Sequence, residues 1–175
     1  MITLSRIDVT RLLDKLCKIN EEVNQPIDID EVKKAIYYAK KYHGSQMRQS
    51  GEPYYSHPIE VAYMVAEYAE SEIPRYFRTD MIVTSILHDT IEDTKLIEKM
   101  IAYIFGSTVA SQVEALTRVK PHGKISSKEI LNLLYQQKKY DVAFIKIFSR
   151  IHNLQPLLAI MSSTMIFKKL KKSLK

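Results

Sequence analysis

The chain has 175 residues and a formal net charge of +6, with 46% hydrophobic and 26% charged residues. This composition is that of a globular domain and excludes a mainly disordered chain or collagen, while the single cysteine excludes an intramolecular disulfide scaffold. Four Gly and six Pro supply few hairpin turns, so we do not expect a β-sandwich or barrel.

The start of the chain, residues 1–23, is expected to be an N-terminal helix. Charged residues interrupt its apolar positions, so the segment does not resemble a signal peptide, and no run in the chain approaches the ~20 apolar residues of a membrane span. With one cysteine, Cys17, these features predict a cytoplasmic protein. The helix is expected over residues 3–21, and its apolar face would consist of Leu4, Ile7, Leu12, Leu16 and Ile19.

Helical periodicity continues through residues 31–160, which we expect to form the main domain after a linker at 24–30. Asp28 or Asp30 is a candidate N-cap for the first of these helices. Alternating strand patterns and internal repeats are absent, so the predicted fold class is an all-α single domain of about eight helices. The expected helices cover about 31–43, 59–69, 80–91, 95–105, 107–119, 130–135 and 142–158.

Glycine and proline mark the breaks between these helices. The segment 44–58 holds two of the four Gly and two of the six Pro, so it is expected to be a shaped loop leading into a helix. Loops of this length are more often functional than idle. Pro74 breaks the next helix, and Gly106 is a suitable C-terminal cap. A basic loop is expected at 120–127.

Positive charge is concentrated in the last third of the chain. From residue 118 onward there are 13 Lys and Arg against two acidic residues, whereas the first 117 residues carry a net charge of −5. Residues 161–175 form a basic C-terminal tail. Such a basic region attracts nucleic acid, nucleotide phosphates or acidic lipid, or is simply a solvated helical surface.

The sequence HDTIED, residues 88–93, is the strongest chemical feature. On a continuous helix, His88, Asp89, Glu92 and Asp93 would share one face directly after an apolar segment. Three carboxylates beside apolar residues are costly unless they are neutralised, paired or bound to a cation. A divalent metal ion would resolve this conflict and use the histidine as well. The alternative is an exposed acidic helix face.

Two further segments place polar residues in fixed surroundings. His57 lies where the loop at 44–58 enters a helix, and Arg48 is nine residues earlier, where it could contact phosphate or stack on a base. Arg150, His152 and Asn153 interrupt an apolar helical stretch and need polar partners. Taken alone, His57 is compatible with a packed histidine. Arg150, His152 and Asn153 are compatible with polar residues satisfied inside the core.

The three segments occur in a recognisable order: RQSGEPYYSHP, then LHDTIEDT, then IKIFSRIHNL. Together with the intervening IFGSTVASQVEALTRVK, they resemble the hydrolase domain of the RelA/SpoT alarmone family. This family belongs to the His-Asp metal-dependent phosphohydrolase superfamily. The resemblance covers residues from about 32 to 157 and implies an all-helical His-Asp fold.

The resemblance also implies an enzyme and its site. Members remove the 3′-diphosphate from ppGpp and pppGpp, releasing pyrophosphate and GDP or GTP, with a divalent cation that is usually Mn²⁺. His57, His88 and Asp89 match metal ligands, and Glu92 and Asp93 match the acids that orient or activate water. Residues that match nucleotide-binding positions are Arg48, Ser50 and Asn153.

The third segment departs from the family pattern A-D-R-L-H-N-M-R-T. Ser149 stands where the Asp that supplies the fourth metal ligand is usual, and Gln155 and Pro156 replace the usual Arg and Thr. In the first segment, Gln49 follows Arg48 where a basic residue is common. A site with two histidines and one carboxylate is still a workable metal site, but it would hold Mn²⁺ less tightly.

These departures leave several functions open. The leading prediction is a stand-alone alarmone hydrolase, whose partner is the guanosine nucleotide and which acts without a membrane and without a synthetase domain in this chain. The alternatives are a degenerate nucleotide-binding module without turnover, a metal phosphohydrolase for another nucleotide, and a basic helical domain that binds nucleic acid, which is not the expected partner. The oligomeric state stays open.

Overall fold

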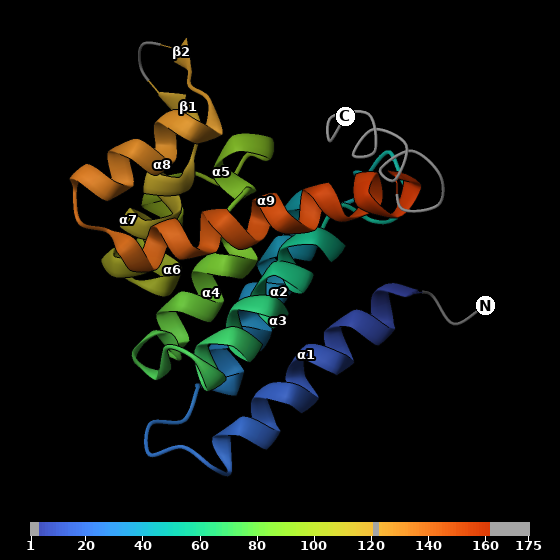
Figure 1. Cartoon of the computed structure of the whole chain (residues 1–175), viewed down its shortest axis with the longest axis vertical. Coiled ribbons are helices and arrows are strands. Elements are labelled where there is room, and N and C mark those ends of the chain that lie inside the picture. Colours follow the sequence, from blue (N-terminus) through green and yellow to red (C-terminus); the bar gives the residue numbers. More distant parts are fainter. Residues whose placement is uncertain (1–3, 121–122, 162–175) are drawn as a thin grey trace, which may run out of the picture.

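The first helix, α1 (Leu4–Asn20), lies along α3 (Ser56–Ser71) at one edge of the molecule (Figure 1). The computed structural model describes residues 4–120 and 123–161. Leu12, Leu16 and Ile19 of α1 are buried, so these three positions of the expected apolar face pack inward, while the side chains of Leu4 and Ile7 lie outside the described part of the structure. The helix is also joined to α3 by the ion pairs Arg11–Glu60 and Lys15–Glu70.

The second helix, α2 (Ile29–His43), is capped by its own flanking residues. The side chain of Asp28 accepts hydrogen bonds from the backbone N–H groups of Asp30 and Glu31, so Asp28 is the N-cap of the two candidates. Gly44 ends the helix at a φ of 55°, which a residue with a side chain rarely adopts.

Helix α3 lies at the centre of the fold. It packs against α1, against α4 (Thr79–Leu87) and against the long α9 (Tyr140–Met161), and α4 in turn packs against α2 and α7 (Ser107–Leu116). A short 3₁₀ turn, η1 (Pro74–Tyr76), follows α3 at the expected proline break. Helix α9 contacts α3, α4, α7 and α8 (Ser127–Gln136), and Figure 1 shows it running across α4 and α3.

The helix expected over 80–91 is interrupted, which corrects the sequence prediction. Helix α4 ends at Leu87, and α5 (Thr90–Asp93) is a separate single turn. The Thr90 hydroxyl donates to the Leu87 carbonyl at 2.6 Å, and His88 Nδ1 donates to the Ser85 carbonyl at 2.8 Å. These side chains take carbonyls that a continuous helix would bond to its backbone.

The next helices differ from the prediction at their ends. Gly106, with a φ of 89°, lies between α6 (Glu98–Phe105) and α7, as expected for a helix C-cap. Helix α7 stops at Leu116 rather than near 119, because β1 (Val119–Lys120) pairs antiparallel with β2 (Gly123–Lys124). The basic loop is therefore partly a two-residue hairpin, a small exception to the confirmed all-α fold class.

Helix α8 (Ser127–Gln136) begins earlier than the apolar periodicity indicates. Ser126 and Glu129 form a reciprocal capping box, in which each side chain bonds the backbone N–H of the other residue. This cap adds a polar first turn to the helix. Of the expected basic tail at 161–175, only Met161 is described, as the last residue of α9. Residues 162–175 lie outside the described part.

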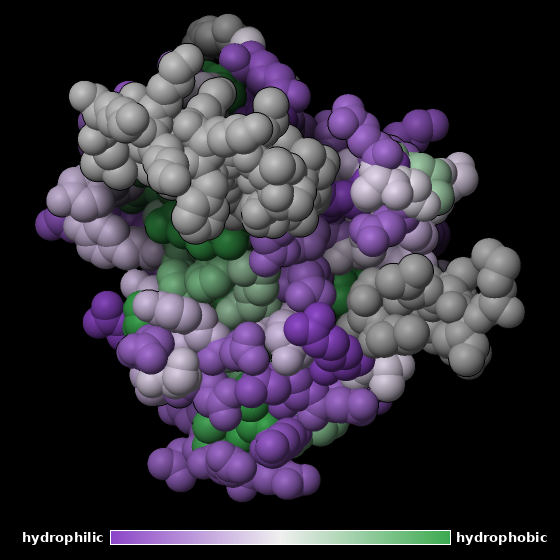
Figure 2. Space-filling model, turned by 45° about the vertical axis from the view of Figure 1, so that its right-hand side comes forward, coloured by the Kyte–Doolittle hydropathy of each residue, from purple (hydrophilic) through white to green (hydrophobic). Residues whose placement is uncertain are grey.

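Figure 2 shows hydrophilic side chains over much of the face that it draws, with a large area of apolar side chains near its centre and a smaller one below. Exposed apolar side chains include Tyr68 of α3 and Ile147, Ile151 and Leu154 of α9. No helix in the described ranges is long and apolar enough to cross a membrane.

Candidate metal centre

The structure brings together three of the side chains that match metal ligands. His57 lies in the first turn of α3, and His88 and Asp89 lie at the break between α4 and α5. Each offers one ligand atom, and these atoms lie within 4.8 Å of one another. His57 Nε2 is 3.5 Å from Asp89 Oδ2, and His88 Nε2 is 3.1 Å from Asp89 Oδ1. Both histidines are buried.

The hydrogen bonds around His88 show that this group fits a cation. His88 Nδ1 donates its proton to the Ser85 carbonyl, because a carbonyl oxygen only accepts. In the neutral imidazole, Nε2 therefore presents a lone pair toward the Asp89 carboxylate. Two acceptors at this distance need a proton or a metal ion between them. A backbone carbonyl that fixes the tautomer is also the usual outer partner of a metal-binding histidine.

The charge states of this group suit metal binding. Burial and the neighbouring His88 lower the pKa of His57 to about 2, so its imidazole is neutral and free to ligate. Burial alone would raise the pKa of Asp89, but His88 and His57 lower it by more, and the carboxyl is held ionised. The group therefore offers two imidazole nitrogens and one anionic oxygen, a donor set typical of Mn²⁺, Fe²⁺ or Zn²⁺.

Ser149 of α9 faces the same point. Its side chain is buried, and its Oγ lies 3.3 Å from His57 Nε2 and 3.1 Å from His88 Nε2. The hydroxyl thus takes the place beside the three candidate ligands where the family pattern has a carboxylate. A neutral hydroxyl is a weaker ligand for a divalent cation than a carboxylate.

His152 supports the group from the other side of His57. The Nδ1 atoms of His57 and His152 are 2.8 Å apart, so one of them donates to the other. The interpretation of His152 as a polar residue satisfied within the fold agrees with this contact. The partner itself, 95 residues away in sequence, was not predictable from local spacing.

Glu92 and Asp93 do not share a helix face with His88 and Asp89 as expected, because the helix is broken between them. The carboxylate of Glu92 binds Arg118 Nη2 at 2.6 Å and Lys124 Nζ at 2.8 Å, and its side chain is only 5% exposed. Glu92 therefore joins α5 to the β1–β2 hairpin.

Asp93 is more exposed and is bonded differently. The Tyr54 hydroxyl donates to Asp93 Oδ2 at 2.6 Å. Burial, followed by the charge of Asp89, raises the pKa of Tyr54, so the phenol keeps the proton that it donates. Tyr54 was not among the residues singled out from the sequence, although it lies in the GEPYYSHP segment.

Both acids nevertheless line the same polar cavity as Asp89 of the candidate metal centre. The cavity has a volume of about 100 Å³ and brings together residues of α5, α8, α9 and the loop before α3. Three basic residues line it: Arg118 and Lys146, which the sequence analysis did not single out, and Arg150, which it treated as a polar residue satisfied inside the core. The lining residues are Tyr54, Asp89, Glu92, Asp93, Arg118, Ser127, Lys146, Ser149, Arg150 and Asn153.

Of the residues that match nucleotide-binding positions, Asn153 lines the cavity and Arg48 bonds to it. Arg48 Nη2 donates to Asn153 Oδ1 at 3.1 Å, which links the loop at 44–55 to α9. Ser50 is exposed in a turn closed by the bonds from Arg48 N to Glu52 O and from Gly51 N to Arg48 O. Arg48 and Asn153 are thus brought together, and Ser50 stays at the surface nearby.

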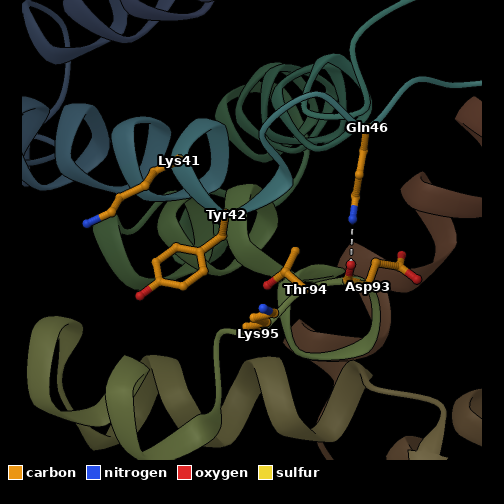
Figure 3. A pocket seen from close by; sticks show the side chains of 6 residues that line it. All are labelled: Lys41, Tyr42, Gln46, Asp93, Thr94 and Lys95. Carbon is orange, nitrogen blue, oxygen red and sulfur yellow. Dashed lines mark hydrogen bonds between the residues drawn. The ribbon is translucent and has the colours of Figure 1, made fainter.

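A second pocket lies beside the same loop, with a volume of about 480 Å³ (Figure 3). Gln46 reaches from the loop and donates to the Asp93 carbonyl at 2.8 Å, as the dashed line in Figure 3 shows. His43 donates to Gln46 Oε1 at 2.9 Å and stacks on Tyr54. The loop therefore holds Asp93 through both its backbone and its carboxylate. The pocket is lined by Lys41, Tyr42, Gln46, Asp93, Thr94 and Lys95.

Buried His43 predicts a loss of stability in acid. Burial lowers its pKa below the ordinary value, and its Nε2 has no hydrogen-bond partner among residues 4–120 and 123–161. The unfolded chain takes up a proton below about pH 6.5 and the native state does not, so the free energy of unfolding is highest above that pH. It then falls by up to about 1.4 kcal/mol per pH unit for each such histidine.

We expect the metal-free chain to show this dependence in urea unfolding between pH 7 and pH 5. The variant His43→Phe keeps a flat ring against Tyr54 but cannot be protonated, so its stability should fall less steeply with pH. The bond to Gln46 is lost at every pH and does not affect the slope. Parallel slopes for parent and variant would show that His43 does not contribute.

Comparison with known proteins places this arrangement in a family. The HD domain family model matches residues 35–165, and the chain belongs to the HD domain family. Within it, the chain is 33% identical over 152 residues to the GTP pyrophosphokinase rsh of Brucella ovis, covering 83% of this chain and 19% of that protein. It is 34% identical over 128 residues to the guanosine-3′,5′-bis(diphosphate) 3′-pyrophosphohydrolase of Aquifex aeolicus, covering 73% of this chain and 16% of that protein.

A solved structure shows the same fold. It is described as a metazoan ortholog of SpoT that hydrolyses ppGpp, and it superposes with a TM-score of 0.57 at 22% identity over 74% of this chain and 71% of that one. The RelA/SpoT resemblance of the three sequence segments is therefore confirmed by relatives with these names. The chain spans less than a fifth of the length of the two curated relatives given above.

Proposed function

We propose that this chain hydrolyses the 3′-diphosphate of ppGpp or pppGpp and releases pyrophosphate with GDP or GTP. The observation that carries the proposal is the meeting of His57, His88 and Asp89 beside a cavity lined by both acidic and basic side chains. Relatives named as hydrolases of this nucleotide support it. Cytoplasmic location stays a prediction from the sequence.

In this proposal His57, His88 and Asp89 hold a divalent cation, for which we propose Mn²⁺. When bound, such a cation supplies positive charge to phosphoryl oxygens and lowers the pKa of an adjacent water molecule. His57 and His88 contribute imidazole nitrogens, and Asp89 contributes the anionic oxygen. The Ser85 carbonyl and His152 keep the two rings oriented.

The acids of α5 take different parts in this proposal. Asp93 is the better candidate to accept a proton from the attacking water, because its carboxylate is exposed and held by a single hydroxyl, that of Tyr54. Glu92 is already neutralised by Arg118 and Lys124. We propose that Glu92 holds the β1–β2 hairpin at the cavity through its ion pairs with Arg118 and Lys124.

We place the guanosine at the rim formed by Arg48, Ser50 and Asn153. The guanidinium of Arg48 offers a planar surface for a base and donors for phosphate oxygens. The bond between Arg48 and Asn153 shows that both side chains reach a common point. A nucleotide bound there would have its 3′-diphosphate close to the cavity.

Ser149 favours a second candidate function, a module that binds the nucleotide without turning it over. Its hydroxyl fills the position of a usual carboxylate ligand and already contacts both histidines. The loss of one anionic ligand weakens the hold on a divalent cation. A binding module would keep the rim residues and lose only the chemistry.

The experiment that separates these functions measures pyrophosphate release from ppGpp with Mn²⁺ and with EDTA. We expect release that depends on Mn²⁺ and that stops in EDTA. Binding of ppGpp without release at any Mn²⁺ concentration would support the binding module. If the chain neither binds ppGpp nor releases pyrophosphate from it, both candidate functions are wrong.

A further inference from the structure

Lys146 is a buried cation in the middle of α9. Lys146 is only 5% exposed, and its Nζ donates to the Leu116 carbonyl at 3.3 Å. The same side chain lines the cavity next to the metal-ligand group, together with Asp89 and Ser149. An ammonium group has three N–H donors, and the Leu116 carbonyl satisfies one of them.

No carboxylate in the described part of the chain forms an ion pair with Lys146, although three line the same cavity. Asp89 is bonded to His88, Glu92 to Arg118, and Asp93 to Tyr54. A buried charge without a paired countercharge is costly. Burial indeed lowers the pKa of Lys146, and the charges of Asp89 and Glu92 only partly oppose this.

The residue at position 149 also leaves Lys146 without a countercharge. Ser149 follows Lys146 by three residues on α9, so both side chains lie on one face of the helix. A carboxylate at 149, as in the family pattern, would stand one turn from the ammonium group. With a serine there, this carboxylate is missing beside Lys146, and the acids across the cavity are bonded to other residues.

We propose that Lys146 binds a phosphoryl oxygen of an anionic ligand that enters the cavity. The identification of the anion as a phosphoryl group rests on the proposed function. Lys146 provides a charge on the side of the cavity formed by α9, and its anchor on the Leu116 carbonyl limits the movement of the ammonium group. Its role is to bind the ligand rather than to transfer a proton.

A structural role is the competing explanation, because a cation on the last carbonyl of α7 also stabilises that helix end. The variant Lys146→Met separates the two. An apolar side chain of similar length replaces a buried unpaired charge at little or no cost in stability. If Lys146 served only to cap α7, the variant would melt at a lower temperature and bind anions as before.

The test titrates inorganic pyrophosphate into the metal-free chain and measures affinity by NMR. We expect Lys146→Met to bind about tenfold more weakly or worse, as for the loss of one charge-assisted hydrogen bond. The matched control Lys99→Gln removes an exposed lysine on α6 and should bind like the parent. Equal affinity for parent and Lys146→Met, or equal losses in Lys146→Met and Lys99→Gln, would overturn the proposal.

A second measurement needs no variant. The ε-methylene signal of Lys146 in the parent chain should shift as pyrophosphate saturates the site, and an unchanged signal would overturn the proposal. Because both readouts use pyrophosphate without metal, they do not depend on turnover. A chain that fails to hydrolyse ppGpp but binds pyrophosphate through Lys146 would contradict the proposed activity alone.

Discussion

Replacing Asp89 by Asn should abolish Mn²⁺-dependent hydrolysis of ppGpp and weaken Mn²⁺ binding by about a hundredfold or more. Asp89 is the only carboxylate among the three side chains that meet at the candidate metal centre. Its anionic oxygen supplies the charge that a hard divalent cation prefers, and a carboxamide oxygen is neutral. In many metal sites, removing a residue that only hydrogen-bonds to a ligand already weakens metal binding about ten- to a hundredfold. Removing a ligand itself should therefore weaken it more.

The measurement is calorimetric titration of Mn²⁺ together with the pyrophosphate-release assay. Asp30→Asn is a matched control, because it makes the same change on the surface of α2, where the Asp30 side chain is 91% exposed. Circular dichroism should show the same helix content in all three proteins. A folded Asp89→Asn variant that binds Mn²⁺ like the parent would show that the ion does not bind at this group.

Replacing Ser149 by Asp should tighten Mn²⁺ binding by about tenfold or more, where each factor of ten corresponds to about 1.4 kcal/mol. The Ser149 hydroxyl already lies 3.3 Å and 3.1 Å from the two histidine nitrogens, so a carboxylate there would face the ion. Without metal, the new charge would lie close to Asp89 in a buried site. The metal-free variant should therefore melt at a lower temperature than the parent and be restored by Mn²⁺.

The control for this change is Ser149→Asn, which has the shape of Asp without the charge. It should bind Mn²⁺ no better than the parent. Hydrolysis is expected to increase only partly in Ser149→Asp, because Gln155 and Pro156 also depart from the family pattern and a small displacement of the nucleotide costs rate. If Ser149→Asp folds normally and binds Mn²⁺ like Ser149→Asn, the ion is not held between the two histidines.

The helices were largely predictable because each depends on local patterns. The apolar spacing of α1, the Asp28 cap and the Gly106 break all appear within a few residues of sequence. The break at His88 did not, because it is produced by the bonds of two side chains to backbone carbonyls of α4. The hairpin also escaped notice, since two-residue strands have no measurable periodicity.

In the site, residue types were predictable but pairings were not. The histidines and acids form recognisable segments, and the structure places His57, His88 and Asp89 together. The bond of Glu92 to Arg118 spans 26 residues, and that of Tyr54 to Asp93 spans 39. Such partners are fixed by the packing of helices, so the separate environments of Glu92 and Asp93 required the structure.

Helix α9 contacts the rest of the molecule through side chains with quite different partners. Asp141 pairs with Arg78, Lys146 reaches the end of α7, His152 meets His57, and Asn153 meets Arg48. One inserted residue would turn everything after it by about 100° and advance it by about 1.5 Å. An insertion or deletion in the middle of α9 would thus misplace several contacts at once. Substitutions at constant length, such as Ser149→Asp, would leave all of these contacts in register.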